Sequence, residues 1–169
     1  MPNAAFANYI EHLTVDVGSN NPGAVGIRYD VANSGVMKDV RIKGDGPSET
    51  CSGRYGLMFV KNAGPGYVKN VSVEGFDIGI YADVDGACNN NIVFEHITLM
   101  GQRTYGIENN TKLFTIRDLY SENTVPAVHI EYDVSSLFMV ESRLASPLAT
   151  TAPAIRGTSD GGVYLRDVT

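Results

Sequence analysis

The chain has 169 residues, of which 43% are hydrophobic and 19% are charged, and these values predict one folded domain rather than a disordered chain. Its net charge is −6 and it contains no basic run, so we expect no nucleic-acid partner. We find no window of about 18 apolar residues. The N-terminus also lacks a basic segment followed by an apolar core, so the sequence predicts neither a membrane span nor a signal peptide.

A short motif recurs along the chain, in which apolar residues flank a central polar residue and then alternate with polar ones. Apolar residues at steps of two, with Val, Ile, Thr and Tyr frequent, are typical of β-strands. The copies are Tyr9–Val15, Val36–Ile42, Tyr67–Val73, Val93–Leu99, Thr115–Leu119, Met139–Leu144 and Tyr164–Val168. Their central residues, 22 to 31 positions apart, are His12, Asp39, Asn70, His96, Asp118, Glu141 and Asp167.

A second motif, a small residue followed by an apolar one, lies between these copies and advances with them. Its members are Gly26-Ile27, Gly56-Leu57, Gly79-Ile80, Gly106-Ile107, Ala127-Val128 and Ala154-Ile155. The two series together predict an all-β fold, a right-handed single-stranded parallel β-helix of six to seven coils with three short strands per coil. One domain would span residues 1–169, and each strand would pair with its counterpart about 4.8 Å away in the next coil.

The central residues of the first motif stand at a sharp bend between two predicted strands. Asn and Asp tolerate a left-handed backbone there, so we interpret Asp39, Asn70 and Asp118 as structural. His12 and His96 occupy the same place in the repeat. We therefore expect them to be turn residues rather than metal ligands.

Three segments carry a family resemblance: Asn8–Asp16, Asn21–Ile27 and Val73–Ile80. They resemble the pectate-lyase-like superfamily of right-handed β-helices, above all the branch of glycoside hydrolase family 55, the exo-β-1,3-glucanase type. The resemblance implies a polysaccharide or oligosaccharide partner and a secreted or cell-surface location. The chain begins and ends in mid-repeat without a capping helix, so we expect a piece lacking one or both end caps, whose open strand edges favour self-association.

The same resemblance implies that the strands of the small–apolar motif line the substrate groove. If their apolar members point inward, alternation turns the following residue outward. That outward row is Arg28, Met58, Tyr81, Glu108, His129 and Arg156. A second row, two positions later, is Asp30, Val60, Asp83, Asn110, Glu131 and Thr158. A register slip of one residue would reverse every assignment.

These rows supply the candidate site. Glycoside hydrolysis needs two carboxyl groups about 5 Å apart for retention or about 6.5–9.5 Å apart for inversion. We predict Glu108, Glu131 and Asp83 as the catalytic carboxylates. The predicted substrate-binding residues are Arg28, Tyr81, His129, Arg156 and Asp30. A lyase would instead use Arg28, His129 or Arg156 as its base.

We expect no metal ligand set and no cofactor. Asp83–Gly86 carries the alternating carboxylates of a calcium loop but lacks the remaining ligands, so we interpret it as a turn. Cys51 and Cys88 are expected to be free thiols, with a disulfide between them as the alternative.

Three functions remain open at this stage. The chain is a polysaccharide-binding or polysaccharide-degrading β-helix, a structural or adhesive module of the tailspike or surface-protein type without chemistry, or an inactive fragment that still folds. Fold alone does not choose among them.

Overall fold

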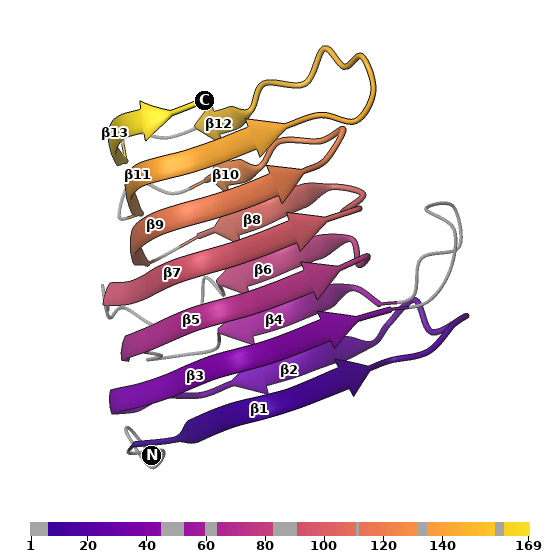
Figure 1. The fold of residues 1–169 in the computed structure, drawn as a ribbon, viewed down its shortest axis with the longest axis vertical. Coiled ribbons are helices and arrows are strands. Elements are labelled where there is room, and N and C mark those ends of the chain that lie inside the picture. Colours follow the sequence, from indigo (N-terminus) through magenta and orange to yellow (C-terminus); the bar gives the residue numbers. More distant parts are fainter. Residues whose placement is uncertain are drawn as a thin grey trace.

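The computed structural model describes residues 7–44, 53–59, 64–82, 91–110, 112–131, 135–157 and 161–169, without the side chains of residues 32 and 33. The described chain forms two parallel sheets (Figure 1). The seven strands of the first sheet, the long-strand sheet, are β1 (Tyr9–Asp16), β3 (Ala32–Lys43), β5 (Gly64–Glu74), β7 (Asn91–Met100), β9 (Leu113–Glu122), β11 (Ser136–Ala145) and β13 (Gly162–Val168). The second, the short-strand sheet, contains β2 (Val25–Tyr29), β4 (Tyr55–Phe59), β6 (Ile78–Ala82), β8 (Tyr105–Asn109), β10 (Val128–Ile130) and β12 (Ile155–Gly157).

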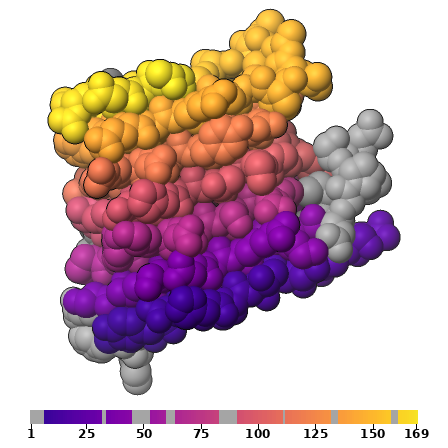
Figure 2. Space-filling view, viewed as in Figure 1, coloured from indigo at the N-terminus to yellow at the C-terminus, as the bar shows by residue number. Residues whose placement is uncertain are grey.

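The chain alternates between the two sheets, and each strand pairs in parallel with the next strand of its own sheet. In Figure 1 the long strands run one way in front and the short strands run back behind them as the chain rises, which is a right-handed path. Figure 2 shows the coils stacked in chain order. The predicted all-β parallel β-helix is thereby confirmed. Within the described ranges there is no helix, and so none that could cross a membrane.

A residue with left-handed backbone divides each long strand into two limbs, at all seven predicted positions. The φ angles of His12, Asp39, Asn70, His96, Asp118, Glu141 and Asp167 lie between 53° and 56°. Two limbs plus one short strand account for the three strand segments predicted per coil. Each pair of limbs nevertheless belongs to one strand, whose pairing skips the bend residue and resumes in register after it.

The left-handed residue also changes which residues face the core. In β7, Ile92 and Phe94 are buried before the bend, and Ile97 and Leu99 are buried after it. Strict alternation would have continued the inward face at residues 96 and 98. The extra residue at the bend, His96, instead lets both limbs bury their apolar side chains.

Small residues of the second motif lie where there is no space for a larger side chain. A Cβ added at Gly56 would lie 2.2 Å from Val73 Cγ1, and one at Gly79 would lie 2.6 Å from the carbonyl oxygen of Gly106. The following residues point inward as predicted: Leu57, Ile80 and all four of their counterparts are buried or packed on the core. The inward register of the short-strand sheet is therefore confirmed.

Apolar side chains from both sheets fill the space between them. The rings of Phe59, Phe94 and Phe114 form an edge-to-face cluster, with centroids 4.9–6.4 Å apart, that joins the short-strand sheet to the long-strand sheet. The large exposed apolar side chains belong mostly to the first and last coils: Tyr9, Leu13, Val25, Phe138, Leu148, Val163, Tyr164 and Leu165. Cys51 and Cys88, and with them the predicted state of the thiols, lie outside the described residues.

A pair of substitutions at Asn70 tests the requirement for left-handed backbone. Asn70→Val and Asn70→Gly both remove the hydrogen bond that the Asn70 amide donates to Asp39. Only Val also places a β-branched side chain at φ 53°. We expect Asn70→Val to be less stable than Asn70→Gly by about 1–2 kcal/mol in urea unfolding. Equal stability of the two variants would show that the bend tolerates any side chain.

Candidate functional site

One outward row crosses the whole short-strand sheet. Strand pairing aligns Arg28 with Met58, Met58 with Tyr81, Tyr81 with Glu108, Glu108 with His129, and His129 with Arg156. This is the row that alternation predicts. The two arginines lie at opposite ends of the row, on strands separated by four others, so they do not share one site.

A compact cluster forms near one end of this row from Glu108, His129 and Glu131. One ligand atom from each of the three side chains lies within 4.8 Å of the others. Glu108 on β8 stands directly across from His129 on β10, and Glu131 follows the end of β10. In the part of the chain that the structure describes, no other three His, Cys, Asp or Glu side chains come together in this way.

Backbone hydrogen bonds hold the cluster in place. The Glu131 amide donates to the carbonyl oxygen of Asn109, 3.3 Å away, which extends the β8–β10 pairing to Glu131. The side chain of Asn109 is buried and closes the turn after β8, because its amide donates to the Lys112 carbonyl at 2.8 Å and its oxygen accepts the Lys112 amide at 2.9 Å. The carboxylates are thus carried by a fixed backbone rather than by a free loop.

His129 is buried although it belongs to the outward row. Its side chain is 5% exposed, and its ring stacks on Tyr105 with centroids 4.3 Å apart. Neither ring nitrogen has a hydrogen-bond partner within the described part of the chain. Burial lowers the pKa of His129, the charge of Arg156 acts in the same direction, and the Glu131 carboxylate opposes both.

Glu108 is half-buried beside it. Burial raises the pKa of the Glu108 carboxyl, and the charge of Glu131 adds to that rise. The Asn110 amide, which donates to Glu108 Oε1 at 3.2 Å, and the charge of Arg54 act in the opposite direction. Glu108 therefore holds its proton more tightly than an ordinary glutamate.

A second aromatic stack lies two strands away. Tyr81 stacks on Tyr55 with centroids 4.3 Å apart and planes 14° from parallel, and the Arg54 guanidinium lies 4.9 Å from the Tyr55 centroid.

Sequence reasoning missed Tyr55 and Tyr105, because each lies two residues before an inward residue and alternation would turn it inward. The signal was the Tyr-Gly pair in both strands: the glycine marks a break in the alternation.

The other predicted site residues are scattered or not described. Arg28 and Asp30 are exposed near β2, at the far end of the sheet from the cluster, and Arg156 is exposed on β12 beside His129. Asp83, the third predicted catalytic carboxylate, lies outside the described residues, as does the Asp83–Gly86 segment. The predicted catalytic role of Asp83 therefore stays a prediction.

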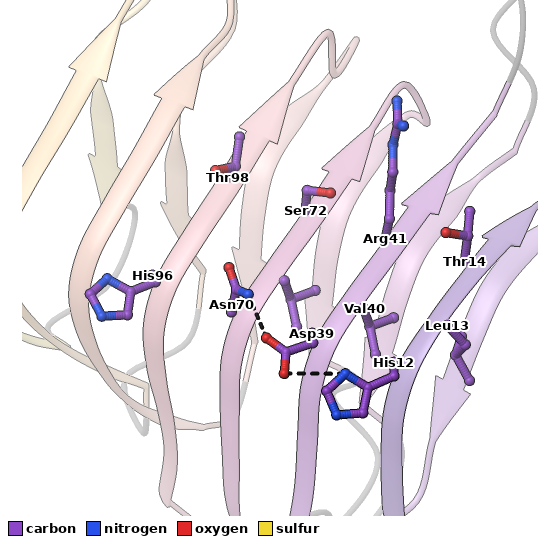
Figure 3. A pocket seen from close by; sticks show the side chains of 11 residues that line it. His12, Leu13, Thr14, Asp39, Val40, Arg41, Asn70, Ser72, His96 and Thr98 are labelled. Carbon is purple, nitrogen blue, oxygen red and sulfur yellow. Dashed lines mark hydrogen bonds and ion pairs between the residues drawn. The ribbon is translucent and has the colours of Figure 1, made fainter.

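A shallow groove of about 400 Å³ lies on the long-strand sheet, along the left-handed bends (Figure 3). Its polar side chains pair largely with one another or with neighbours. Asp39 accepts a hydrogen bond from Asn70 and lies 3.5 Å from His12, and the Asn70 bond lowers the pKa of Asp39. His96 pairs with Asp118. These contacts agree with a structural role for the bend residues.

The two faces differ in what they offer a ligand. Several polar groove side chains pair with one another or with adjacent residues. On the short-strand sheet, both buried imidazole nitrogens of His129 lack a partner among the residues that the structure describes. A carboxyl group with a raised pKa, such as Glu108, beside a second carboxylate is also an arrangement that suits acid–base chemistry on a glycosidic bond. The cluster on the short-strand sheet is therefore the stronger candidate site.

Comparison with protein-family models, with curated proteins and with solved structures found no significant match to this chain.

The pKa of Glu108 can be moved in either direction by its charged neighbours. Glu131→Gln removes a negative charge, so we expect it to lower the pKa of Glu108, whereas Arg54→Met removes a positive charge and should raise it. Carboxyl ¹³C shifts followed through a pH titration measure both effects. Glu141→Gln, on the long-strand sheet, is the control and should leave Glu108 unchanged. A rise on Glu131→Gln would contradict the arrangement.

Proposed function

We propose that this protein binds a polysaccharide along the outward face of its short-strand sheet. The observation that carries the proposal is the continuous outward row of aromatic, charged and hydrogen-bonding side chains, aligned strand by strand. A solvated sheet face needs polar residues, but it does not need stacked tyrosines and a buried histidine beside two carboxylates.

Each part of the row suits a different part of a sugar. Sugar rings present C–H groups on their faces and hydroxyl groups around their rims. The partly exposed Tyr81 ring offers an apolar surface for a ring face. Carboxylates such as Glu131 accept hydrogen bonds from hydroxyl groups, and the exposed Arg28 and Arg156 donate to hydroxyl oxygens or to uronate carboxylates.

The scaffold favours a polymer over a single sugar. Six strands at about 4.8 Å spacing make a row about 24 Å long, which is enough for several linked sugar units. Side chains on a stacked sheet hold fixed positions, and the Tyr55–Tyr81 stack restrains its rings before any ligand arrives. Binding then costs less side-chain entropy.

The resemblance of Asn8–Asp16, Asn21–Ile27 and Val73–Ile80 to the pectate-lyase-like superfamily, and to the glycoside hydrolase family 55 branch within it, supports the same ligand class. We place the chain in that branch as part of the proposal. The function proposed is binding. Hydrolysis by Glu108 and Glu131 is an additional activity, which a separate reducing-sugar assay on the bound polysaccharide would detect.

A glycan array followed by affinity electrophoresis in soluble polysaccharides tests this function. We expect Tyr81→Ala to weaken binding to the best polysaccharide about tenfold, equivalent to about 1.4 kcal/mol, because an aromatic contact is lost. Tyr164→Ala is the matched control, since Tyr164 is an exposed tyrosine on the long-strand sheet. Thermal unfolding of each variant separates loss of binding from loss of fold.

A second pair of variants decides which sheet binds. Ser72 and Thr98 are paired across β5 and β7 and line the groove of Figure 3. Ser72→Ala with Thr98→Val should leave polysaccharide binding unchanged. If the double variant loses polysaccharide binding and Tyr81→Ala keeps it, the ligand binds the long-strand sheet instead. If the folded protein binds none of the glycans, the proposed function is excluded.

A further inference from the structure

The imidazole of His129 makes no hydrogen bond to any residue that the structure describes, and this needs a physical explanation. Buried polar atoms in folded proteins nearly always have a partner. His129 is 5% exposed, and both Nδ1 and Nε2 are buried without one. The ring is held by its stack on Tyr105, so a backbone fixed on β10 and an aromatic neighbour keep it beside the two carboxylates.

The three side chains have the geometry of a ligand set. Two ligands bound to one zinc ion at about 2.0–2.2 Å can stand no more than about 4.4 Å apart. The ligand atoms of Glu108, His129 and Glu131 already lie within 4.8 Å of one another. Small side-chain rotations therefore bring all three within bonding distance of a common centre, without movement of the paired strands.

We propose that Glu108, His129 and Glu131 bind a divalent metal ion of the zinc class. The imidazole selects for zinc and its transition-metal neighbours, because calcium and magnesium prefer oxygen ligands alone. Three protein ligands leave coordination positions for water or a ligand hydroxyl, as in catalytic rather than structural zinc sites. The sequence had predicted no metal ligand set, because Glu131 and His129 are separated from Glu108 by more than 20 residues.

A metal ion would also balance the charges of the cluster. Two carboxylates within 4.8 Å of each other repel, and the charge of Glu131 acts unfavourably on Glu108. Among the described residues, the charge of Arg54 acts on Glu108 and the charge of Arg156 acts on His129. A divalent ion at the centre would compensate both carboxylates at once and give the His129 nitrogen an electron-pair acceptor.

His96 provides an internal comparison. It also lies between two carboxylates, with Nε2 3.2 Å from Glu95 and Nδ1 paired with Asp118. There, however, the histidine is exposed and both nitrogens face a carboxylate directly, so no buried atom lacks a partner. His96→Gln is therefore the matched control: it removes a histidine beside two acids from the other sheet.

The experiment is metal binding by the whole chain without any sugar, so its outcome is independent of the proposed polysaccharide binding. Protein stripped with a chelator is titrated with Zn²⁺ by calorimetry, in parallel with Ca²⁺, and Co²⁺ is used as an optical probe. We expect one Zn²⁺ per chain, tighter than Ca²⁺, with His129 imidazole resonances shifted in the NMR spectrum. Glu131→Gln, at an exposed position, should weaken Zn²⁺ binding at least tenfold. His96→Gln should not.

Each contrary result overturns the assignment. The site is absent if folded wild-type protein binds no Zn²⁺ at millimolar concentration, or if His96→Gln abolishes binding and Glu131→Gln does not. Preference for Ca²⁺ over Zn²⁺ would exclude the zinc class. His129→Gln serves as a further variant only if its unfolding temperature matches the wild type.

Discussion

The left-handed residue in the middle of each long strand is the constraint on which this β-helix depends. A side chain disfavours this backbone conformation, yet seven residues adopt it at nearly the same φ. What offsets the cost is burial on both sides of the bend: Phe94 before His96 and Ile97 after it both reach the core. Since the bend recurs in every coil, the limbs on either side of it can pair in register along the whole stack.

On the short-strand sheet, the small residues of the second motif let successive coils lie close together. At Gly56 and Gly79 an added Cβ would meet a side chain or the carbonyl of the next coil. Close stacking there fixes the short-strand sheet, and with it the alignment of Glu108 opposite His129. The candidate site is therefore a consequence of the same packing that stabilises the rod, because no separate loop is needed to bring its residues together.

The short-strand face and the long-strand groove show two ways of placing polar groups on a solenoid. Along the groove, neighbouring side chains bind one another. Asp39 accepts a hydrogen bond from Asn70, and Arg41 makes a bidentate ion pair with Glu74. On the short-strand face, burial raises the pKa of Glu108 and lowers the pKa of His129, whose ring nitrogens have no hydrogen-bond partner among the described residues. Such an arrangement lowers the stability of the folded state, and proteins retain destabilising arrangements of this kind mainly at functional sites.

The sequence by itself determined the coils, the seven bends and the inward register of the short strands. These features are local: a two-residue alternation, a polar residue at the bend and a small residue at the close approach recur within each coil. It also placed Glu108 and His129 on one row. Only the tertiary structure decided that Tyr105 covers His129 and that Glu131 lies beside Glu108. The physical reason is that stacking and burial depend on side chains from neighbouring coils. They also depend on the break in alternation at each Tyr-Gly pair.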